Sequence, residues 1–123
     1  TLPENTISRE LCHLIDLVPT FMELAGDEAK YPSELPELDG ISIVSTFSGK
    51  KLMRTNPLFF QYGSWQAIRQ NQWKLVQRKQ EPWLLYDLDQ DRTETRDLAG
   101  KFSERVKDME KSWEGWAREV GAK

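Results

Sequence analysis

The residues whose types could carry out chemistry lie close together at one place, where Cys12, His13 and Asp16 fall within five positions. A cysteine nucleophile needs a base within hydrogen-bond reach, but neighbouring residues of a helix or strand point in different directions, so Cys12 and His13 form a poor pair. As metal ligands the cluster offers three donors at most. The sequence holds one His and one Cys in all, whereas a tetrahedral site needs four ligands or an open position on a rigid scaffold. The sequence therefore favours a structural role, with Cys12 packed and Asp16 capping a helix.

Five tryptophans form the second group of interest, because indole rings can stack on a sugar or on a nucleic-acid base. Trp65, Trp73 and Trp83 fall in predicted strands, where aromatic pairs across strands are also ordinary sheet packing. A carbohydrate-binding or protein-interaction module that uses surface Trp residues is therefore an alternative function. Gly-rich phosphate loops and Ser-His-Asp arrangements are absent from the sequence, and the single His leaves most acid–base schemes without a partner.

Composition limits the classes of partner. The chain has 123 residues, with 17 Lys and Arg against 20 Asp and Glu, and a formal net charge of -3. Binding of nucleic acid or of an anionic membrane requires concentrated positive charge, so we expect neither partner. No apolar run reaches the roughly 20 residues that cross a bilayer, and the single cysteine excludes a disulfide within the chain. The first residues lack the features of a signal peptide, and we expect the sequence to be a piece of a longer chain.

Helix and loop signals dominate the first 56 residues. Asp16 is a candidate N-cap for a short helix through Glu23 or Leu24, and Gly26 supplies a left-handed stop. Apolar residues at helical spacing are expected to form an exposed patch, consisting of Leu14, Leu17, Phe21 and Leu24. We expect a surface loop over residues 27–40, a further helical turn over 41–47 and a linker over 50–56.

From residue 57 the pattern changes to runs of β-branched and aromatic residues. These runs predict four antiparallel strands, at 58–60, 65–69, 72–77 and 83–88. A two-residue turn at Gln70 and Asn71 would join the middle strands, because Asn accepts a positive φ. This turn sets Ile68 opposite Trp73 on one apolar face.

The final segment carries the clearest helical periodicity, between a candidate N-cap at Ser103 and a stop at Gly121. Its apolar stripe consists of Val106, Met109, Trp113, Trp116 and Val120. Because neither surface can stay in water, we predict that this stripe packs on the apolar face of the sheet. The fold class is therefore α+β, a small four-stranded antiparallel sheet packed by a C-terminal helix and preceded by a short helix and loop.

Four phrases follow one another along the chain. Residues 13–26 read HLIDLVPTFMELAG, residues 38–42 LDGIS, residues 67–76 AIRQNQWKLV and residues 85–99 LYDLDQDRTETRDLA. In this order and spacing they resemble four phrases of the C-terminal part of arylsulfatase-type sulfatases: h-x-x-D-x-x-P-T-x-x-x-L-A-G, L-D-G-x-S, A-I-R-x-G-x-W-K-L-V and L-Y-D-L-x-x-D-P-x-E-x-x-N-L-A. The chain departs from these patterns with Asn71 in place of Gly, Arg92 in place of Pro and Asp97 in place of Asn.

The resemblance implies a division of the chain. Residues 1–56 would be the tail of the large α/β sulfatase domain, a short helix and loop at its edge, and residues 57–123 the C-terminal antiparallel sheet plus closing helix. The complete protein would be a sulfuric ester hydrolase that uses calcium and a formylglycine made from a C/S-x-P-x-R motif. Cys12 fails that motif, since Leu14 and Asp16 take the places of Pro and Arg. The catalytic groups and metal ligands are then expected upstream, and this chain alone is predicted to be inactive.

The implied partners are the missing N-terminal catalytic domain of the same chain and, through it, a sulfated substrate. In sulfatases the loop after the first strand of the small sheet approaches the substrate cleft, and a His or Glu often stands at the position of Gln61. The resemblance therefore implies a substrate rim, with ordinary loop packing as the alternative. Its candidate residues are His13, Gln61, Tyr62, Ser64 and Trp65.

Overall fold

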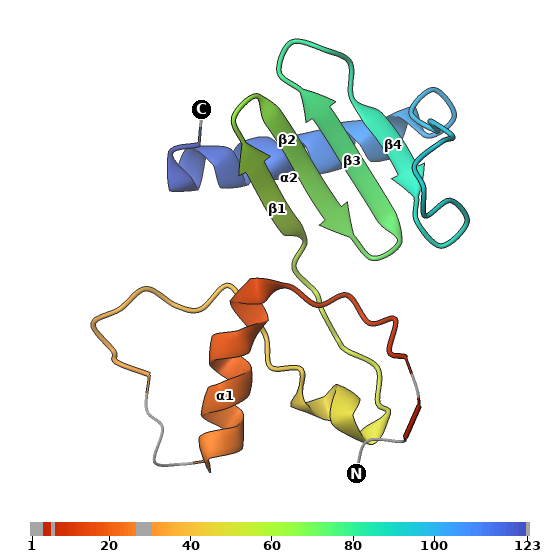
Figure 1. The fold of residues 1–123 in the computed structure, drawn as a ribbon. Coiled ribbons are helices and arrows are strands. Elements are labelled where there is room, and N and C mark those ends of the chain that lie inside the picture. The colour runs from red at the N-terminus through yellow and green to blue at the C-terminus, as the bar shows by residue number, and fades with distance from the viewer. Residues whose placement is uncertain (1–3, 6, 27–30, 123) are drawn as a thin grey trace. The chain divides into compact units, whose positions relative to one another are not determined.

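The computed structural model describes residues 4–5, 7–26 and 31–122 (Figure 1). The chain divides into two compact units, Thr1–Thr55 and Asn56–Lys123, and each has its own elements. The first four residues of the predicted loop over 27–40 lie outside the described residues, and the rest of that loop contains neither helix nor strand. In the described part of the chain, no helix is both long enough and apolar enough to span a bilayer.

The first unit contains the 3-10 helix η1 (Leu14–Asp16), the α-helix α1 (Leu17–Ala25) and the 3-10 helix η3 (Val44–Ser48). The helix predicted after Asp16 is therefore confirmed, and the helical turn expected from Ile41 begins at Val44 instead. Asp16 occupies the predicted N-cap position of α1, but its carboxylate makes no capping bond to that helix and accepts from the backbones of His13 and Ile41 instead. Gly26 ends the helix with a φ of 75°, but its ψ of -161° lies outside the left-handed helical region.

One side of the η1–α1 segment carries exposed apolar side chains. The four residues predicted to form a patch are all exposed, and a fifth joins them, so the α1 patch consists of Leu14, Leu17, Val18, Phe21 and Leu24. Contiguous apolar surface of this kind is typical of a segment that another polypeptide covers.

The second unit contains an antiparallel sheet of four strands in the order β1-β2-β3-β4. The strands are β1 (Leu58–Tyr62), β2 (Trp65–Gln70), β3 (Trp73–Arg78) and β4 (Leu84–Asp87). Side chains alternate between the two faces of each strand. Ile68, Leu75 and Leu85 pair across three strands and are fully buried on one face. The four predicted strands and the α+β fold class are confirmed.

The register of the middle hairpin differs from the prediction. Ile68 pairs with Leu75, and Gln70 pairs with Trp73, so the turn residues are Asn71 and Gln72. The reason is that Asn71 takes its positive φ of 54° at the first turn position rather than the second. Moving the turn by one residue shifts each pairing by two, which keeps the same side chains on the buried face.

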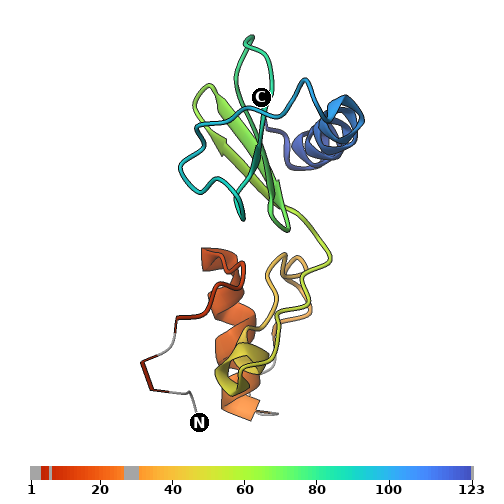
Figure 2. The ribbon, with the colours of Figure 1, turned by 90° about the vertical axis from the view of Figure 1, so that its right-hand side faces the viewer.

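The helix α2 (Ser103–Val120) covers that face of the sheet (Figures 1 and 2). Met109, Trp113 and Ala117 are buried against the three central strand residues, which confirms the predicted packing. Val120 does not join them and is 54% exposed, because the end of α2 extends past the edge strand β1 (Figure 1). The predicted cap at Ser103 is also wrong: the N-cap is Phe102, whose ring lies 5.2 Å from that of Trp73.

The loop after β4 covers the outer edge of the sheet, where an unpaired strand would otherwise expose its backbone. The Asp97 carboxylate accepts hydrogen bonds from the backbone of Leu85 at 3.0 Å and of Ala99 at 2.9 Å. One side-chain oxygen makes both bonds, and an Asn carries the same oxygen, so Asp at this position keeps the arrangement. The Asp91 carboxylate accepts hydrogen bonds from the backbone N–H groups of Thr95 and Arg96. These bonds fix the loop that contains Arg92, the position at which the resembled phrase has proline.

Candidate functional site

The hairpin between β1 and β2 holds four of the five residues predicted at a substrate rim. Tyr62 pairs directly with Trp65, and the turn between them consists of Gly63, with a φ of 54°, and Ser64. Tyr62 is 87% exposed and Trp65 is 52% exposed. The backbone N–H of Lys79 donates to the carbonyl of Ser64 at 2.6 Å, which ties the end of β3 to this turn.

The hairpin does not bring the four side chains to one surface. Tyr62 and Trp65 lie on the face of the sheet opposite α2, whereas Gln61 shares the face of Phe59, whose ring stacks on Trp116 of α2 at 5.2 Å. Gln61 is half-buried and Ser64 is exposed in the turn. The accessible aromatic part of the predicted rim is therefore the Tyr62–Trp65 pair.

His13, the fifth predicted residue, lies in the first unit, where it caps η1. Its Nδ1 accepts from the backbone of Ile15 at 3.4 Å, and its own backbone N–H donates to Asp16 Oδ2 at 2.7 Å. The two bonds form a reciprocal capping box around the short helix. This geometry gives His13 a structural role in its own unit.

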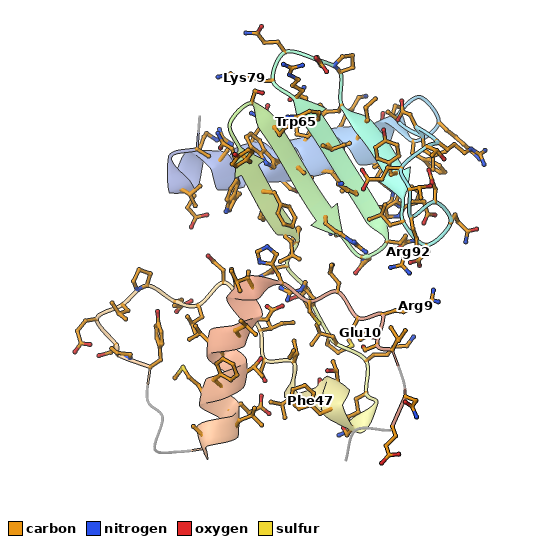
Figure 3. All side chains as sticks on the ribbon, in the orientation of Figure 1. Arg9, Glu10, Phe47, Trp65, Lys79 and Arg92 are labelled. Carbon is orange, nitrogen blue, oxygen red and sulfur yellow. The ribbon has the colours of Figure 1, made fainter. Side chains whose placement is uncertain are left out.

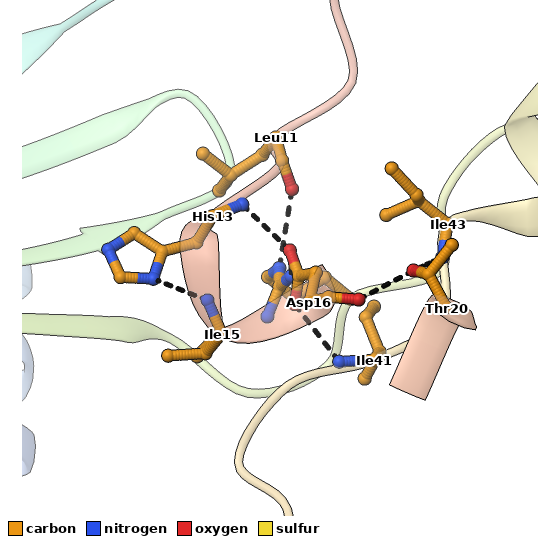
Figure 4. Close-up of polar contacts among 8 residues, drawn as sticks. Leu11, His13, Ile15, Asp16, Thr20, Ile41 and Ile43 are labelled. Atoms are coloured by element: carbon orange, nitrogen blue, oxygen red, sulfur yellow. Dashed lines mark hydrogen bonds and ion pairs between the residues drawn. The ribbon is translucent and has the colours of Figure 1, made fainter. Parts of the chain in front are cut away.

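Asp16 is the polar centre of the first unit (Figure 4). Its Oδ1 accepts from the backbone of Ile41 at 3.0 Å, and its Oδ2 accepts from His13 and forms an ion pair with Arg54. Both charged side chains are buried, with 1% of Asp16 and 6% of Arg54 exposed. Arg54 also donates to the carbonyl of Leu11. One carboxylate thus joins three segments that are far apart in the sequence.

Two neighbouring features reinforce this junction. Thr20 Oγ1 donates to the carbonyl of Asp16 at 2.5 Å and accepts from the backbone of Ile43 at 3.1 Å. Gly40 passes so close to Ile15 that a Cβ at that position would lie 2.0 Å from the Ile15 carbonyl oxygen. The Asp and Thr of the D-x-x-P-T phrase and the Gly of the L-D-G-x-S phrase therefore act together to hold one backbone crossing.

The electrostatics of this junction explain the charge state of Asp16. Burial acts to raise its pKa, but the hydrogen bond from Arg54 and those from the backbones of Ile41 and His13 outweigh it, and the pKa lies below its ordinary value. Asp16 is therefore a fixed anion matched by a fixed cation. A carboxylate held in this way is unsuited to exchange protons with a substrate near neutral pH.

Cys12 is exposed, which corrects the expectation that it packs in a core. Desolvation raises the pKa of its thiol, and the negative charges of Asp16 and Glu10 raise it further. The positive charge of Arg54 lowers it, but the net shift is upward. The thiol is therefore protonated near neutral pH and is a weak nucleophile. Among residues 4–5, 7–26 and 31–122, no group of three or more His, Cys, Asp or Glu side chains could hold a metal ion.

Two of the three tryptophans predicted in strands belong to the interface with α2. The ring of Trp73 in β3 lies under the guanidinium of Arg105 at 4.6 Å. Trp83, directly before β4, donates its indole N–H to Glu110 at 2.8 Å and lies 6.1 Å from the ring of Trp113. Both are half-buried against the core, so a platform built from all three tryptophans does not form.

Comparison with known proteins gives one sequence relative and several structural ones. No family model matches the chain. The choline-sulfatase of Rhizobium meliloti (strain 1021) is 33% identical over 91 residues, which cover 69% of this chain and 17% of that protein. The chain thus spans about a sixth of the length of the curated relative that it matches.

Solved structures match the fold more completely. Ps i-CgsB, crystallised in complex with k-i-k-neocarrahexaose, is 31% identical with a TM-score of 0.70, covering 83% of this chain and 23% of its own. A protein solved with its substrate D-glucosamine-2-N,6-O-disulfate shares the fold with a TM-score of 0.60 at 19% identity, and the match covers 84% of this chain and 23% of that one. The relatives are therefore several times longer than the part of them that this chain matches.

Proposed function

Because the chain is similar in sequence and fold to a C-terminal portion of sulfatases, we propose that it is the C-terminal subdomain of a sulfuric ester hydrolase. In this role it supports the enzyme's fold and borders the substrate cleft without supplying catalytic residues. The observation that carries the proposal is the agreement between the sequence match to a choline-sulfatase and the match of the same chain to larger solved structures. The order of the four sequence phrases agrees with both.

The two units take different parts in this proposal. The second unit, with its own buried core, is the antiparallel sheet and closing helix. The first unit belongs to the edge of the large domain, and its α1 patch packs on the part of the enzyme that corresponds to the remaining length of the relatives. Apolar side chains exposed in this way gain free energy when a neighbouring polypeptide removes them from water.

The cofactors of sulfatases do not fit the described residues of this chain. Cys12 lies outside a C/S-x-P-x-R motif, and Asp16, the buried carboxylate among the described residues of the first unit, is already matched by Arg54. Neither a formylglycine nor a calcium site can therefore be assigned to these residues. In the proposed enzyme both belong to the catalytic domain, and this chain contributes support.

The substrate of the complete enzyme is proposed to be a sulfate ester. The matched proteins differ in what they are named for or were solved with: one is a choline-sulfatase, one was crystallised with k-i-k-neocarrahexaose and one was solved with its substrate D-glucosamine-2-N,6-O-disulfate. At the rim, Tyr62 and Trp65 are the accessible candidates for contact with the substrate. Gln61 is half-buried in β1, Ser64 forms part of the turn and His13 caps η1, so these three support the structure.

The proposal is tested by measuring sulfate release from the longer protein that carries this chain, with and without residues 56–123. We expect ion chromatography to detect sulfate released by the longer protein, and deletion of the second unit to abolish the activity because the exposed catalytic domain loses its support. The Val120→Ala variant, which changes one exposed side chain, is the control. A truncated protein that retains full activity, or a longer protein that releases no sulfate from any ester, would contradict the proposal.

A further inference from the structure

The face of the sheet opposite α2, called the outer face below, carries a row of three accessible side chains. Tyr62 pairs with Trp65, and Trp65 pairs with Arg78, so the three residues lie side by side across β1, β2 and β3. Side chains of directly paired residues point to the same face of a sheet. The row therefore presents a phenol, an indole and a guanidinium in line at one end of the sheet.

The two aromatic rings of this row are not used by the core. The other four tryptophans pack against or belong to α2 and line the buried cluster. Trp65 remains 52% exposed and Tyr62 87% exposed. Large aromatic side chains with one open face are suited to stack on the apolar face of a sugar ring. The exposure of these two rings is thus a feature that the packing of this unit does not account for.

Positive charge accompanies the rings. The side chain of Arg78 is 55% exposed, and its ion pair with Glu81 spans 3.8 Å between two exposed groups. Such a surface pair is weak in water, so the guanidinium can exchange it for another anion. Lys79 follows directly, and Figure 3 shows Trp65 and Lys79 at the same end of the sheet. Two basic residues, Arg78 and Lys79, thus lie at this end of the sheet.

We propose that the row of Tyr62, Trp65 and Arg78 binds a sulfated carbohydrate, with the sugar ring stacked on the indole and phenol and the sulfate paired with the guanidinium. Three neighbouring strands span roughly 10 Å, which is enough to lie under a short stretch of an oligosaccharide. The planar guanidinium of an arginine can donate two parallel N–H bonds to two oxygens of a tetrahedral sulfate group. The proposal rests on the proposed sulfatase function and narrows its substrate class to sulfated carbohydrates, because a row across three strands offers stacking surface for more than one sugar ring beside the guanidinium.

Isothermal titration of this chain with a sulfated carrageenan hexasaccharide tests the proposal. We expect saturable binding that weakens at least tenfold in Trp65→Ala and in Arg78→Gln. The matched control is Arg92→Gln, which removes an exposed arginine at the other end of the sheet (Figure 3) and should leave the affinity unchanged. Thermal unfolding of each variant checks that the fold is kept. The desulfated hexasaccharide should bind at least tenfold more weakly than the sulfated one.

Equal binding by all four proteins, absence of binding, equal binding of the desulfated sugar or tighter binding of choline sulfate would each overturn the proposal. Burial of Trp65 in the longer protein, seen as loss of its fluorescence quenching by acrylamide, would also overturn it. The longer protein separates this proposal from the function it rests on. If that protein releases sulfate from the hexasaccharide and the Trp65 and Arg78 variants keep the same kcat/KM, only the row is refuted. If it releases no sulfate from any ester while the chain still binds the sugar, only the proposed function is refuted.

Discussion

The indole N–H of Trp113 in α2 donates a hydrogen bond of 3.3 Å to the carbonyl of Phe60 in the edge strand β1. Trp113 is also buried between strand residues and the rings of Trp83 and Trp116. A buried indole needs a partner for its N–H, and this carbonyl supplies one. The bond fixes the position of α2 along the sheet, while the ring supplies much of the apolar contact between the two layers.

Replacing Trp113 with Ala should lower the free energy of unfolding by about 3–5 kcal/mol, because it leaves a large cavity under α2. Trp113→Phe should cost less, since it keeps most of the ring but loses a hydrogen bond worth about 0.5–1.5 kcal/mol. Val120→Ala is the control, with a change within about 0.5 kcal/mol because Val120 is exposed. Urea unfolding measures all three, and an unchanged curve for Trp113→Ala would refute the assigned packing.

Replacing glycine with alanine should lower the stability of the fold at Gly40 and raise it at Gly115. In Gly40→Ala the new Cβ would lie 2.0 Å from the Ile15 carbonyl oxygen, so the backbone crossing beside Asp16 must open. In Gly115→Ala the Cβ meets nothing within 4 Å, and the helix interior should gain about 0.5–1 kcal/mol. Thermal unfolding together with the amide spectrum of residues 41–43 measures both effects. A Gly40→Ala protein with an unchanged spectrum would show that the backbones of Gly40 and Ile15 are not in close contact.

The junction at Asp16 should weaken in acid. The pKa of Asp16 is lower in the folded chain than its ordinary value, so the stability that its charge contributes is present above about pH 4 and is lost as the pH falls through the folded pKa. The protection factor of the Ile41 amide, which bonds to Asp16, should therefore fall at low pH, once the exchange rate is corrected for the intrinsic rate of an unstructured peptide at each pH. Asp16→Asn should reduce the protection of the Ile41 amide from exchange already at pH 7, because Arg54 would be left buried without its counter-charge.

The control for this prediction is Asp39→Asn, which changes an exposed carboxylate in the same unit and should leave the pH profile unchanged. Protection factors of the Ile41 and Ile43 amides are followed by NMR from pH 7 down to pH 3. If the protection factors of the Asp16→Asn protein fall with acid as they do in the parent chain, the ion pair does not hold the crossing.

The α1 patch should make the isolated chain bind hydrophobic dyes and self-associate. Phe21→Gln should reduce both effects, since it removes the largest apolar side chain of the patch. Glu23→Gln, which changes an exposed polar residue of the same helix, is the matched control. Dye fluorescence and sedimentation equilibrium provide the measurements. A chain that is monomeric at high concentration and binds no dye would show that the patch needs no partner.

Periodicity and turn chemistry predict most of the second unit, because its contacts are local and repetitive. Alternation along β2 and β3 places Ile68 and Leu75 on the buried face, and the helical spacing of Met109 and Trp113 identifies the face of α2 that covers them. The exposure of Val120 was missed because sequence spacing does not show where a sheet ends beneath a helix. Ala117, which is buried, gave no signal because its side chain is small.

The first unit was harder to predict, since distant pairs hold it together. Nothing in the spacing of the sequence joins Arg54 to Asp16, which lies 38 positions earlier. The Asp signal was interpreted as a helix cap because caps are the commonest use of an Asp before a helix. The substrate rim at Gln61, Tyr62, Ser64, Trp65 and His13 stays a prediction, and the structure shows two of these side chains accessible on the outer face. Arg78 was missed because only the strand register places it beside Trp65.

We propose that this chain is a supporting part of a sulfatase, without catalytic machinery of its own. The measurement that tests it most directly is release of the phenol from an aryl sulfate by the purified 123-residue chain, with and without added calcium. We expect no turnover above the buffer rate under either condition, because no described residue activates the Cys12 thiol, whose pKa is raised, and Asp16 is held by Arg54. Reproducible turnover that disappears in His13→Ala would contradict it.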